Sequence, residues 1–397
     1  MRRAWVIYKI QMFIEVIGVT GMVCGPTFQR LFSLSGTQLG ILLSIGNIGV
    51  LVMSMLIGHA TQRLGGYRTL QIGLGMLLLG LICVIFAHGF LPLLMGLAIL
   101  GIAVAITVNA NNTLLSEIFQ ERIRQVMALA SGLWFTSSAV SVPLIGVWLE
   151  FCWNRGLESY SFRVPYLVGG IFIVVSLFSI RQFLAPLFKD ISHSKVRQSP
   201  QEKCVYSHQK RKSRKWVLVI VLAVFHGFVM LSLYGWLNPM AQAKFGVGET
   251  GGSFLLACFC VGIASGRLIF SRVKLSSDNL KVLSMAGFLG GGFLCLGLIS
   301  PSYIISCIFI AAGCFIYSAA LPTILSIIGA RFEAVKSKLF GYMEAGIAAA
   351  GLLGLPLIGT VLDSGVPHWK ALLIIPLSAW CLGLCSMVWK LTEKGEG

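Results

Sequence analysis

Twelve apolar runs, each about as long as a helix that crosses a bilayer, most constrain what this chain can fold into. A transmembrane helix needs about 20 mostly apolar residues. Strands of a membrane β-barrel would instead appear as segments of about 10 residues with alternating polarity, whereas a run such as "LGMLLLGLICVIFA" is apolar on every side. We therefore predict an all-α membrane protein of twelve transmembrane helices in two six-helix bundles. The expected spans are 5–26, 37–58, 69–88, 90–113, 124–150, 165–187, 215–240, 250–271, 281–299, 302–328, 338–362 and 366–390.

Basic residues predict how the chain is oriented. The chain has 31 Lys and Arg against 14 Asp and Glu. If the N-terminus is cytoplasmic, most of the basic residues lie at the N-terminus, in the even-numbered loops and at the C-terminus, as the positive-inside rule requires. The basic residues of the odd-numbered loops are Arg30, Arg155, Arg163, Lys244 and Lys370. We therefore predict a multi-pass protein of the plasma membrane, the inner membrane of a bacterium, with both termini in the cytoplasm.

The longest polar segment separates the sixth span from the seventh. It divides the chain into an N-terminal six-helix bundle (1–187), a basic cytoplasmic linker (188–214) and a C-terminal six-helix bundle (215–397). Such a basic segment is attracted to anionic lipid at the inner membrane surface. Nucleic acid is not an expected partner, because no aromatic platform for base stacking accompanies the charge.

The two halves of the chain resemble each other. One pair of similar segments is separated by 213 residues and aligns Pro26 with Pro239 and Thr37 with Thr250; a second pair is separated by 210 residues. The pairs are "GPTFQRLFSLSGTQLG" (25–40) with "NPMAQAKFGVGETGGS" (238–253), and "NTLLSEI" (112–118) with "PTILSII" (322–328). Internal duplication of this kind is typical of transporters that work by alternating access.

The polar stretch "GHATQRLGGYR" (58–68) lies between the second and third spans, on the expected cytoplasmic side. It resembles the loop G-x-x-x-D-R-x-G-R-R of the major facilitator superfamily. The matching positions are Gly58, Arg63, Gly65 and Arg68. The segments "LSGTQLGILLS" and "VNANNTLLSEIFQERIRQVMALASGLW" also look like parts of that family. The resemblance implies two six-helix bundles that rock around a central cavity, with this stretch as an inner-side gating loop.

The chain also departs from the family pattern. Gln62 replaces the aspartate that ties the two halves together in one gating state, so the strength of that gate is open. The fifth span lacks the G-x-x-x-G-P-x-x-G-G run of the family's drug antiporters, and the fourth span lacks their early arginine. Efflux by proton antiport is therefore the alternative to uptake rather than the first hypothesis.

Ionisable groups inside the spans are the expected proton-coupling candidates, because a charge at the bilayer centre costs about 2.5–3.5 kcal/mol on insertion scales. These groups are Glu15, His226 and Glu344. The family's helices one, four, seven and ten line the cavity, so the resemblance places Glu15 and His226 toward the solute. Structural alternatives remain open: Glu15 paired with a polar neighbour, His226 in an interhelical hydrogen bond, and Glu344 in a gating ion pair with Arg63 or Arg68.

Neutral polar residues inside the spans would supply recognition without protonation. The expected substrate-cavity residues are Asn47, Asn109, Asn112, Trp134, Tyr234, Asn238 and Tyr317. Asn109 and Asn112 are three residues apart and share a helical face, whereas Asn111 points elsewhere. Amides that merely link helices are the structural alternative. Trp236 is expected to anchor the chain at the membrane interface.

Other classes of protein are weighed against transport. The sequence contains no H-E-x-x-H, G-x-S-x-G or phosphate-loop motif, so we expect no enzymatic activity, no cofactor and no metal site. The favoured hypothesis is a monomeric secondary transporter that takes up a small polar metabolite by proton symport, with Glu15 as the best candidate for coupling. The alternatives are a drug or metabolite efflux antiporter and a non-transporting solute sensor on the same scaffold.

Overall fold

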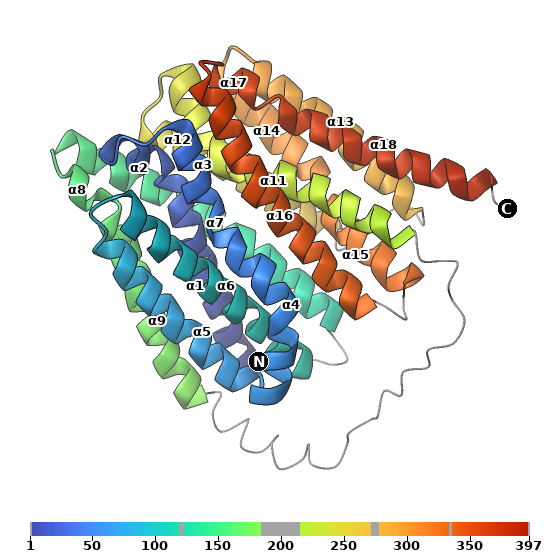
Figure 1. Cartoon of the computed structure of the whole chain (residues 1–397), viewed down its shortest axis with the longest axis horizontal. Coiled ribbons are helices and arrows are strands. Elements are labelled where there is room, and N and C mark those ends of the chain that lie inside the picture. Colours follow the sequence, from blue (N-terminus) through green and yellow to red (C-terminus); the bar gives the residue numbers. More distant parts are fainter. Residues whose placement is uncertain (1, 119–122, 184–214, 271–277, 333–335, 396–397) are drawn as a thin grey trace.

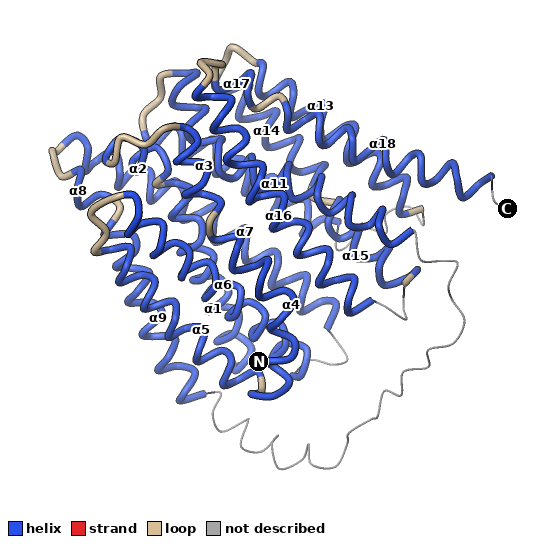
Figure 2. Tube along the Cα trace, in the orientation of Figure 1, coloured by secondary structure: helices blue, strands red, loops and turns tan. Residues whose placement is uncertain are grey.

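The computed structural model describes residues 2–118, 123–183, 215–270, 278–332 and 336–395. This part of the chain is built from helices and short loops and contains no strand (Figure 2). Twelve helical segments are long and apolar enough to cross a membrane. The predicted all-α fold with twelve spans is therefore confirmed. The basic linker (188–214) lies outside the described residues.

The helices follow one another along the chain with only short interruptions inside each half. Four spans are made of two helices each, because the backbone breaks at Ile45, at Phe162, at Ser318–Ala319 and at Leu372–Leu373. In order, the helices are α1 (Arg2–Val23), α2 (Gly25–Leu31), α3 (Gly36–Ser44), α4 (Gly46–Leu64), α5 (Gly66–Ile85), α6 (Phe90–Ile118), α7 (Ile123–Asn154), α8 (Glu158–Ser161), α9 (Arg163–Phe183), α11 (Lys215–Phe245), α12 (Glu249–Phe270), α13 (Asn279–Ile299), α14 (Tyr303–Tyr317), α15 (Ala320–Arg331), α16 (Lys336–Asp363), α17 (His368–Ala371) and α18 (Ile374–Gly395).

The stretch 58–68 is mostly helical, which corrects the prediction of a polar loop. Helix α4 continues to Leu64 and α5 begins at Gly66, so a single residue separates them. That residue is Gly65, with φ of +79°. Residues other than glycine rarely adopt this backbone conformation. One glycine therefore makes the turn between the two helices. The polar residues before it extend the helix beyond its apolar span.

The two ends of the bundle differ in what they carry (Figure 1). Helices α2, α8 and α17 lie at the upper left and top of the view, and we call this the α8 end. On the opposite side, which we call the terminal end, α9 ends and α1 starts along the bottom of the view, and α11 starts and α18 ends at its right. Helices α1–α9 largely occupy the lower left of the view and α11–α18 the upper right.

Two equivalent helix pairs join the halves: α7 packs on α12, and α16 packs on α3 and α4. Glycines allow the close approach. A Cβ atom added at Gly359 of α16 would overlap the backbone of Gly36, and one added at Gly146 of α7 would overlap the side chain of Ser253. Gly146 and Gly359 are 213 residues apart, so the two interfaces are built by corresponding positions of the repeat.

The structure reveals a third pair of similar segments at that offset. The ends of α7 and α16 read "VPLIGVWLE" (142–150) and "LPLIGTVLD" (355–363). Each contains a proline inside its helix, Pro143 and Pro356. Proline removes a backbone hydrogen bond and bends a helix. The two helices that contact the opposite half therefore carry their interior prolines at corresponding positions of the repeat.

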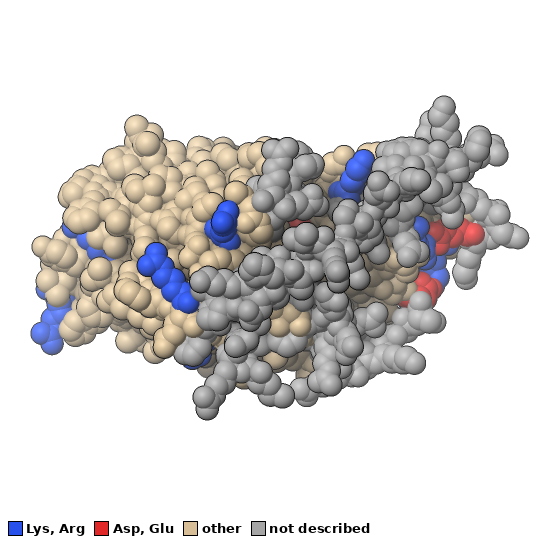
Figure 3. Space-filling model, turned by 90° about the horizontal axis from the view of Figure 1, so that it is seen from below, with Lys and Arg blue, Asp and Glu red and all other residues tan. Residues whose placement is uncertain are grey.

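The outer surface of the bundle is apolar, as lipid contact requires. Many large aliphatic and aromatic side chains are exposed, among them Leu353 and Phe86 at 74% and 69%. The face seen from below carries only a few scattered charged side chains on its described surface (Figure 3). Trp236 is fully buried, and its indole nitrogen donates to the Leu355 carbonyl oxygen at 3.2 Å. The prediction that Trp236 anchors at the interface is therefore wrong.

Candidate functional site

The carboxylate of Glu15 lies midway along α1, where groups from both halves reach it. It accepts hydrogen bonds from the Ser138 hydroxyl of α7 and from the Tyr234 hydroxyl of α11, the latter at 2.5 Å. The two hydroxyl oxygens are 3.2 Å apart, and the Trp134 indole faces the same carboxylate. Glu15 is only 3% exposed. Its pairing with hydroxyl donors reduces the cost of burying a charge.

Arg267 lies in the last turn of α12 and contacts α7 across the interface between the halves. Its Nη1 donates to the Ser131 hydroxyl at 2.7 Å, and its guanidinium carbon is 4.6 Å from the centre of the Phe135 ring. Its Nε is buried and has no hydrogen-bond partner. The charge nevertheless interacts electrostatically with Glu15 and Glu344.

Glu344 lies on α16, about two turns from the start of that helix, and its charge also interacts with Arg267. Its side chain is exposed although it belongs to a membrane span. We call Glu15, Ser138, Tyr234, Arg267 and Glu344 the central layer. It brings together residues from α1, α7, α11, α12 and α16.

His226 of α11 and Tyr317 of α14 form a separate buried pair within the C-terminal half. Their rings are nearly parallel, with centres 5.5 Å apart. Both the His226 Nδ1 and the Tyr317 hydroxyl are buried without a hydrogen-bond partner. The charge of Arg267 acts on His226 as well, so this pair borders the central layer.

The predicted asparagines are dispersed. Asn47 lines a mostly apolar cavity of about 160 Å³ among α1, α3, α4, α6 and α9, together with Tyr166. Asn109 is half-buried and donates to the Ala105 carbonyl of its own helix at 2.8 Å, and Asn112 is also half-buried. Asn111 is fully buried, and its amide nitrogen lies 3.4 Å from the Gln11 side-chain oxygen of α1.

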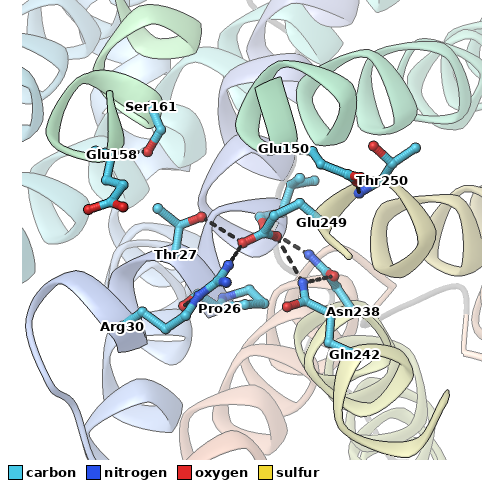
Figure 4. Close-up of polar contacts among 11 residues, drawn as sticks. Pro26, Thr27, Arg30, Glu150, Glu158, Ser161, Asn238, Gln242, Glu249 and Thr250 are labelled. Carbon is cyan, nitrogen blue, oxygen red and sulfur yellow. Dashed lines mark hydrogen bonds and ion pairs between the residues drawn. The ribbon is translucent and has the colours of Figure 1, made fainter. Parts of the chain in front are cut away.

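Polar side chains of both halves meet around Glu249 at the α8 end (Figure 4). Glu249, the first residue of α12, accepts from the Thr27 hydroxyl at 3.0 Å and from the Gln242 amide at 2.8 Å, and it pairs with Arg30. Asn238 belongs to the same group, since its amide nitrogen donates to the Val23 carbonyl at 2.8 Å and its oxygen accepts from Gln242 at 3.0 Å. We call Thr27, Arg30, Asn238, Gln242 and Glu249 the Glu249 cluster.

Two helix caps at the same end cross between the halves in a reciprocal way. The Asp363 carboxylate at the end of α16 accepts from the backbone N–H groups of Gly36 and Thr37 at 2.6 and 2.8 Å, and from the Thr37 hydroxyl at 2.6 Å. The Glu150 carboxylate near the end of α7 accepts from the backbone N–H of Thr250 at 2.9 Å. The offset of 213 separates both the acids and the threonines. Each half therefore caps the corresponding helix of the other.

The predicted gating loop is described only in part. The backbone of Gly58, Gln62 and Arg63 belongs to α4, and the side chains of Gln62 and Arg63 lie outside the described residues. Arg68 is exposed in the first turn of α5. The role of these residues as a gate stays a prediction.

Sequence reasoning missed Arg267, Glu249, Glu150 and Asp363. Each lies close to the end of an expected span, where a charged residue is ordinarily solvated or extends to the interface. The acids could have been found by extending the repeat, because Glu150 and Asp363 match at the same offset as Thr37 and Thr250. For Arg267 the only available signal was its place inside the span expected at 250–271.

Twelve membrane spans in two related halves, with charged groups at the interface between them, define a polytopic membrane protein of the transporter class. The chain matches the model of the Major Facilitator Superfamily over residues 12–328, and it belongs to that family.

Relatives and a solved structure agree with this assignment. The chain is 18% identical over 352 residues to the protein TsgA homolog of Buchnera aphidicola subsp. Baizongia pistaciae (strain Bp), covering 88% of this chain and 85% of that protein. It is 25% identical over 405 residues to the gallate transporter of Pseudomonas putida, covering 90% and 87%. The crystal structure of tetrameric PepTSo2 has the same fold, with a TM-score of 0.71, 13% identity, and coverage of 98% of this chain and 96% of that one.

Proposed function

We propose that this protein takes up a small polar metabolite together with protons, by alternating access to the central layer. In this proposal it is a monomer in a bacterial inner membrane, with the α8 end outside and both termini in the cytoplasm. The distribution of basic residues supports this orientation, because the odd-numbered loops at the α8 end carry few of them.

The observation that carries the proposal is the position of the Glu15 carboxylate. It is buried, its ligands are hydroxyl groups, and one of them, Tyr234, belongs to the other half of the chain. A carboxylate accepts from both hydroxyls, whereas a protonated carboxyl group carries an O–H that itself needs an acceptor. Gain or loss of one proton thus changes a contact between the halves, which is what coupling to their movement requires.

The closed α8 end supports a state in which the central layer is reached from the terminal end. The Glu249 cluster and the two reciprocal caps hold the halves together at the α8 end. Glu344 is exposed and Arg267 is partly exposed. Uptake would require the contacts at the α8 end to break and new contacts to form at the terminal end.

A proton-driven flux assay tests the proposal. Purified protein in liposomes would receive an inward proton gradient, and uptake of gallate, sugars and amino acids would be measured; gallate is included because a relative of this chain transports it. We expect one class to accumulate and to stop accumulating when the gradient is dissipated.

The variant Glu15→Gln sharpens this test. It should abolish proton-driven accumulation while solute exchange at equal pH on both sides continues, because the site remains but can no longer carry the proton. Glu393→Gln, which alters an ion pair with Arg331 near the C-terminus, is the control. Accumulation driven by an outward proton gradient would favour an efflux antiporter. Binding without flux would favour a sensor.

A further inference from the structure

Arg267 has unused hydrogen-bonding capacity at the interface between the two halves. A guanidinium group has five N–H donors, and the structure gives this one a single hydrogen bond, to the Ser131 hydroxyl. Its Nε is buried with no partner, and no carboxylate of the described residues lies within 4.0 Å. Ionisable residues inside membrane spans ordinarily pair with each other or mark a solute pathway.

Two acids stabilise the charge of the guanidinium group without occupying its donors. Glu15 and Glu344 interact with it at a distance, and Glu15 is already bound by the Ser138 and Tyr234 hydroxyls. Phe135 lies against the guanidinium with its centre 4.6 Å from the guanidinium carbon, a cation–π contact that needs none of the N–H groups.

We propose that Arg267 binds the carboxylate group of the transported solute. This inference rests on the proposed function, and it names the class of solute as an organic carboxylate. A carboxylate fits the fork of a guanidinium group with two parallel hydrogen bonds, and it would satisfy the Nε that is left without a partner. The nearby rings of Phe135 and Trp134 provide apolar surface for the rest of the solute.

The same geometry explains why such a solute would travel with protons. The charges of Arg267, Glu15 and Glu344 give a net charge of −1 when both acids are ionised, and an anionic solute would bring it to −2. Proton uptake by one acid restores −1. Among the described residues, the titratable groups that interact with Arg267 are Glu15 on α1, Glu344 on α16 and His226 on α11.

Equilibrium binding tests the inference separately from transport. The probes are gallate and methyl gallate, which share a ring and differ in the free carboxylate, and binding to the purified full-length protein would be measured by calorimetry. We expect gallate to bind at least tenfold more tightly than methyl gallate. Arg267→Gln should remove that preference, and Arg267→Lys should reduce it, because an ammonium group keeps the charge without the fork.

Arg155→Gln, an exposed position after the end of α7, is the matched control and should bind as the unaltered chain does. Gel filtration and unfolding temperature would establish that each variant is folded; should Arg267→Gln fail this test, Arg267→Lys carries the comparison. Equal affinity for gallate and methyl gallate, or an unchanged preference in folded Arg267 variants, would overturn the inference.

The outcomes separate the two proposals. Proton-driven uptake of a neutral solute that persists in Arg267→Gln would refute the carboxylate assignment and leave the transport function standing. Binding of gallate that depends on Arg267, without flux under any gradient, would support the assignment and refute the transport function. Equal binding of sulfate would show a general anion site and also overturn the assignment.

Discussion

The α8 end and the central layer are both polar contacts between the same two halves, yet their charged groups are satisfied differently. At the α8 end, the acids Glu249, Glu150 and Asp363 all accept from donors of the opposite half. In the central layer, Arg267 keeps a buried Nε without a partner, while Glu344 is exposed within a span.

This difference indicates different roles. Groups that satisfy each other hold one arrangement of the halves, so their removal should change the balance between conformations. A group whose donors remain unused is suited to a ligand, so its removal should change binding. Predictions at the α8 end can therefore be separated from those in the central layer by the quantity that changes.

The largest conformational effect is expected from Glu249→Gln. The substitution keeps the size of the side chain but removes the charge that Arg30, Thr27 and Gln242 contact, and hydrogen bonds to charged groups are worth about 1.5–3 kcal/mol each. Since Arg30 is 45% exposed and can be rehydrated, we expect a total of about 2 kcal/mol, or roughly a 30-fold shift toward opening.

Spin labels at positions 155 and 370, exposed on opposite halves at the α8 end, would report the opening as a longer distance between labels. Glu393→Gln is the control. An unchanged distance distribution in Glu249→Gln would show that the Glu249 cluster does not hold this end closed.

A smaller effect is expected from the reciprocal caps. Loss of a helix cap costs about 0.5–2 kcal/mol. Asp363→Ala should cost more than Glu150→Ala, because Asp363 accepts from two backbone N–H groups of the helix it caps and Glu150 accepts from one. We expect about 1 kcal/mol and about 0.5 kcal/mol respectively.

The same label pair measures both cap variants and their combination. The two caps join different helix pairs, so their effects on the opening equilibrium should add. A combined effect well above the sum would show that the two caps open together. Equal effects of the single variants would show that the extra bonds of Asp363 contribute nothing.

The smallest effect is expected at the terminal end, from Asp278→Asn. Asp278 caps α13 by accepting from the Lys281 N–H at 3.1 Å and pairs with Lys390 at 2.6 Å. The Lys390 ammonium group holds the pKa of Asp278 below its usual range. Because both side chains are about one-third exposed, the ion pair should contribute less than about 1 kcal/mol.

The pH dependence of the unfolding temperature tests the contribution of this ion pair to stability. A lowered pKa in the folded state means that the contribution is present above the unfolded-state pKa and is lost as the pH falls through the folded-state pKa. The unfolding temperatures of the unaltered chain and Asp278→Asn should therefore differ slightly at pH 7 and converge in acid below about pH 4. A difference that grows in acid would contradict the assignment.

Much of the fold could be predicted from the sequence because the bilayer imposes a local requirement. Every span must be apolar over about 20 residues, and this requirement can be found without knowing which helices touch. The internal repeat was also visible, through Thr37 and Thr250. The segment that contains Glu150 and the segment that contains Asp363 are separated by the same offset. The sequence repeat therefore includes more of the interface residues than the first two matches indicated.

Glu15 could be singled out because a carboxylate in the middle of a span is costly wherever it points. Its hydrogen-bond partners could not be identified from the sequence. Lipid and the interior of a helical bundle are both apolar, so a membrane helix does not need the polar outer face that distinguishes the two sides of a soluble helix. The sequence therefore gave no local indication that Tyr234 would reach Glu15 from the other half.

The sequence by itself determined the number of spans, the division into two related halves and the family, since hydropathy and repeated motifs are local properties. Only the tertiary structure decided that Arg267 shares an interface with Glu15 and Glu344, and that Asp363 and Glu150 cap helices of the opposite half. These contacts join residues hundreds or tens of positions apart. They depend on how the helices rotate and approach, which the small residues of the interface permit but do not specify.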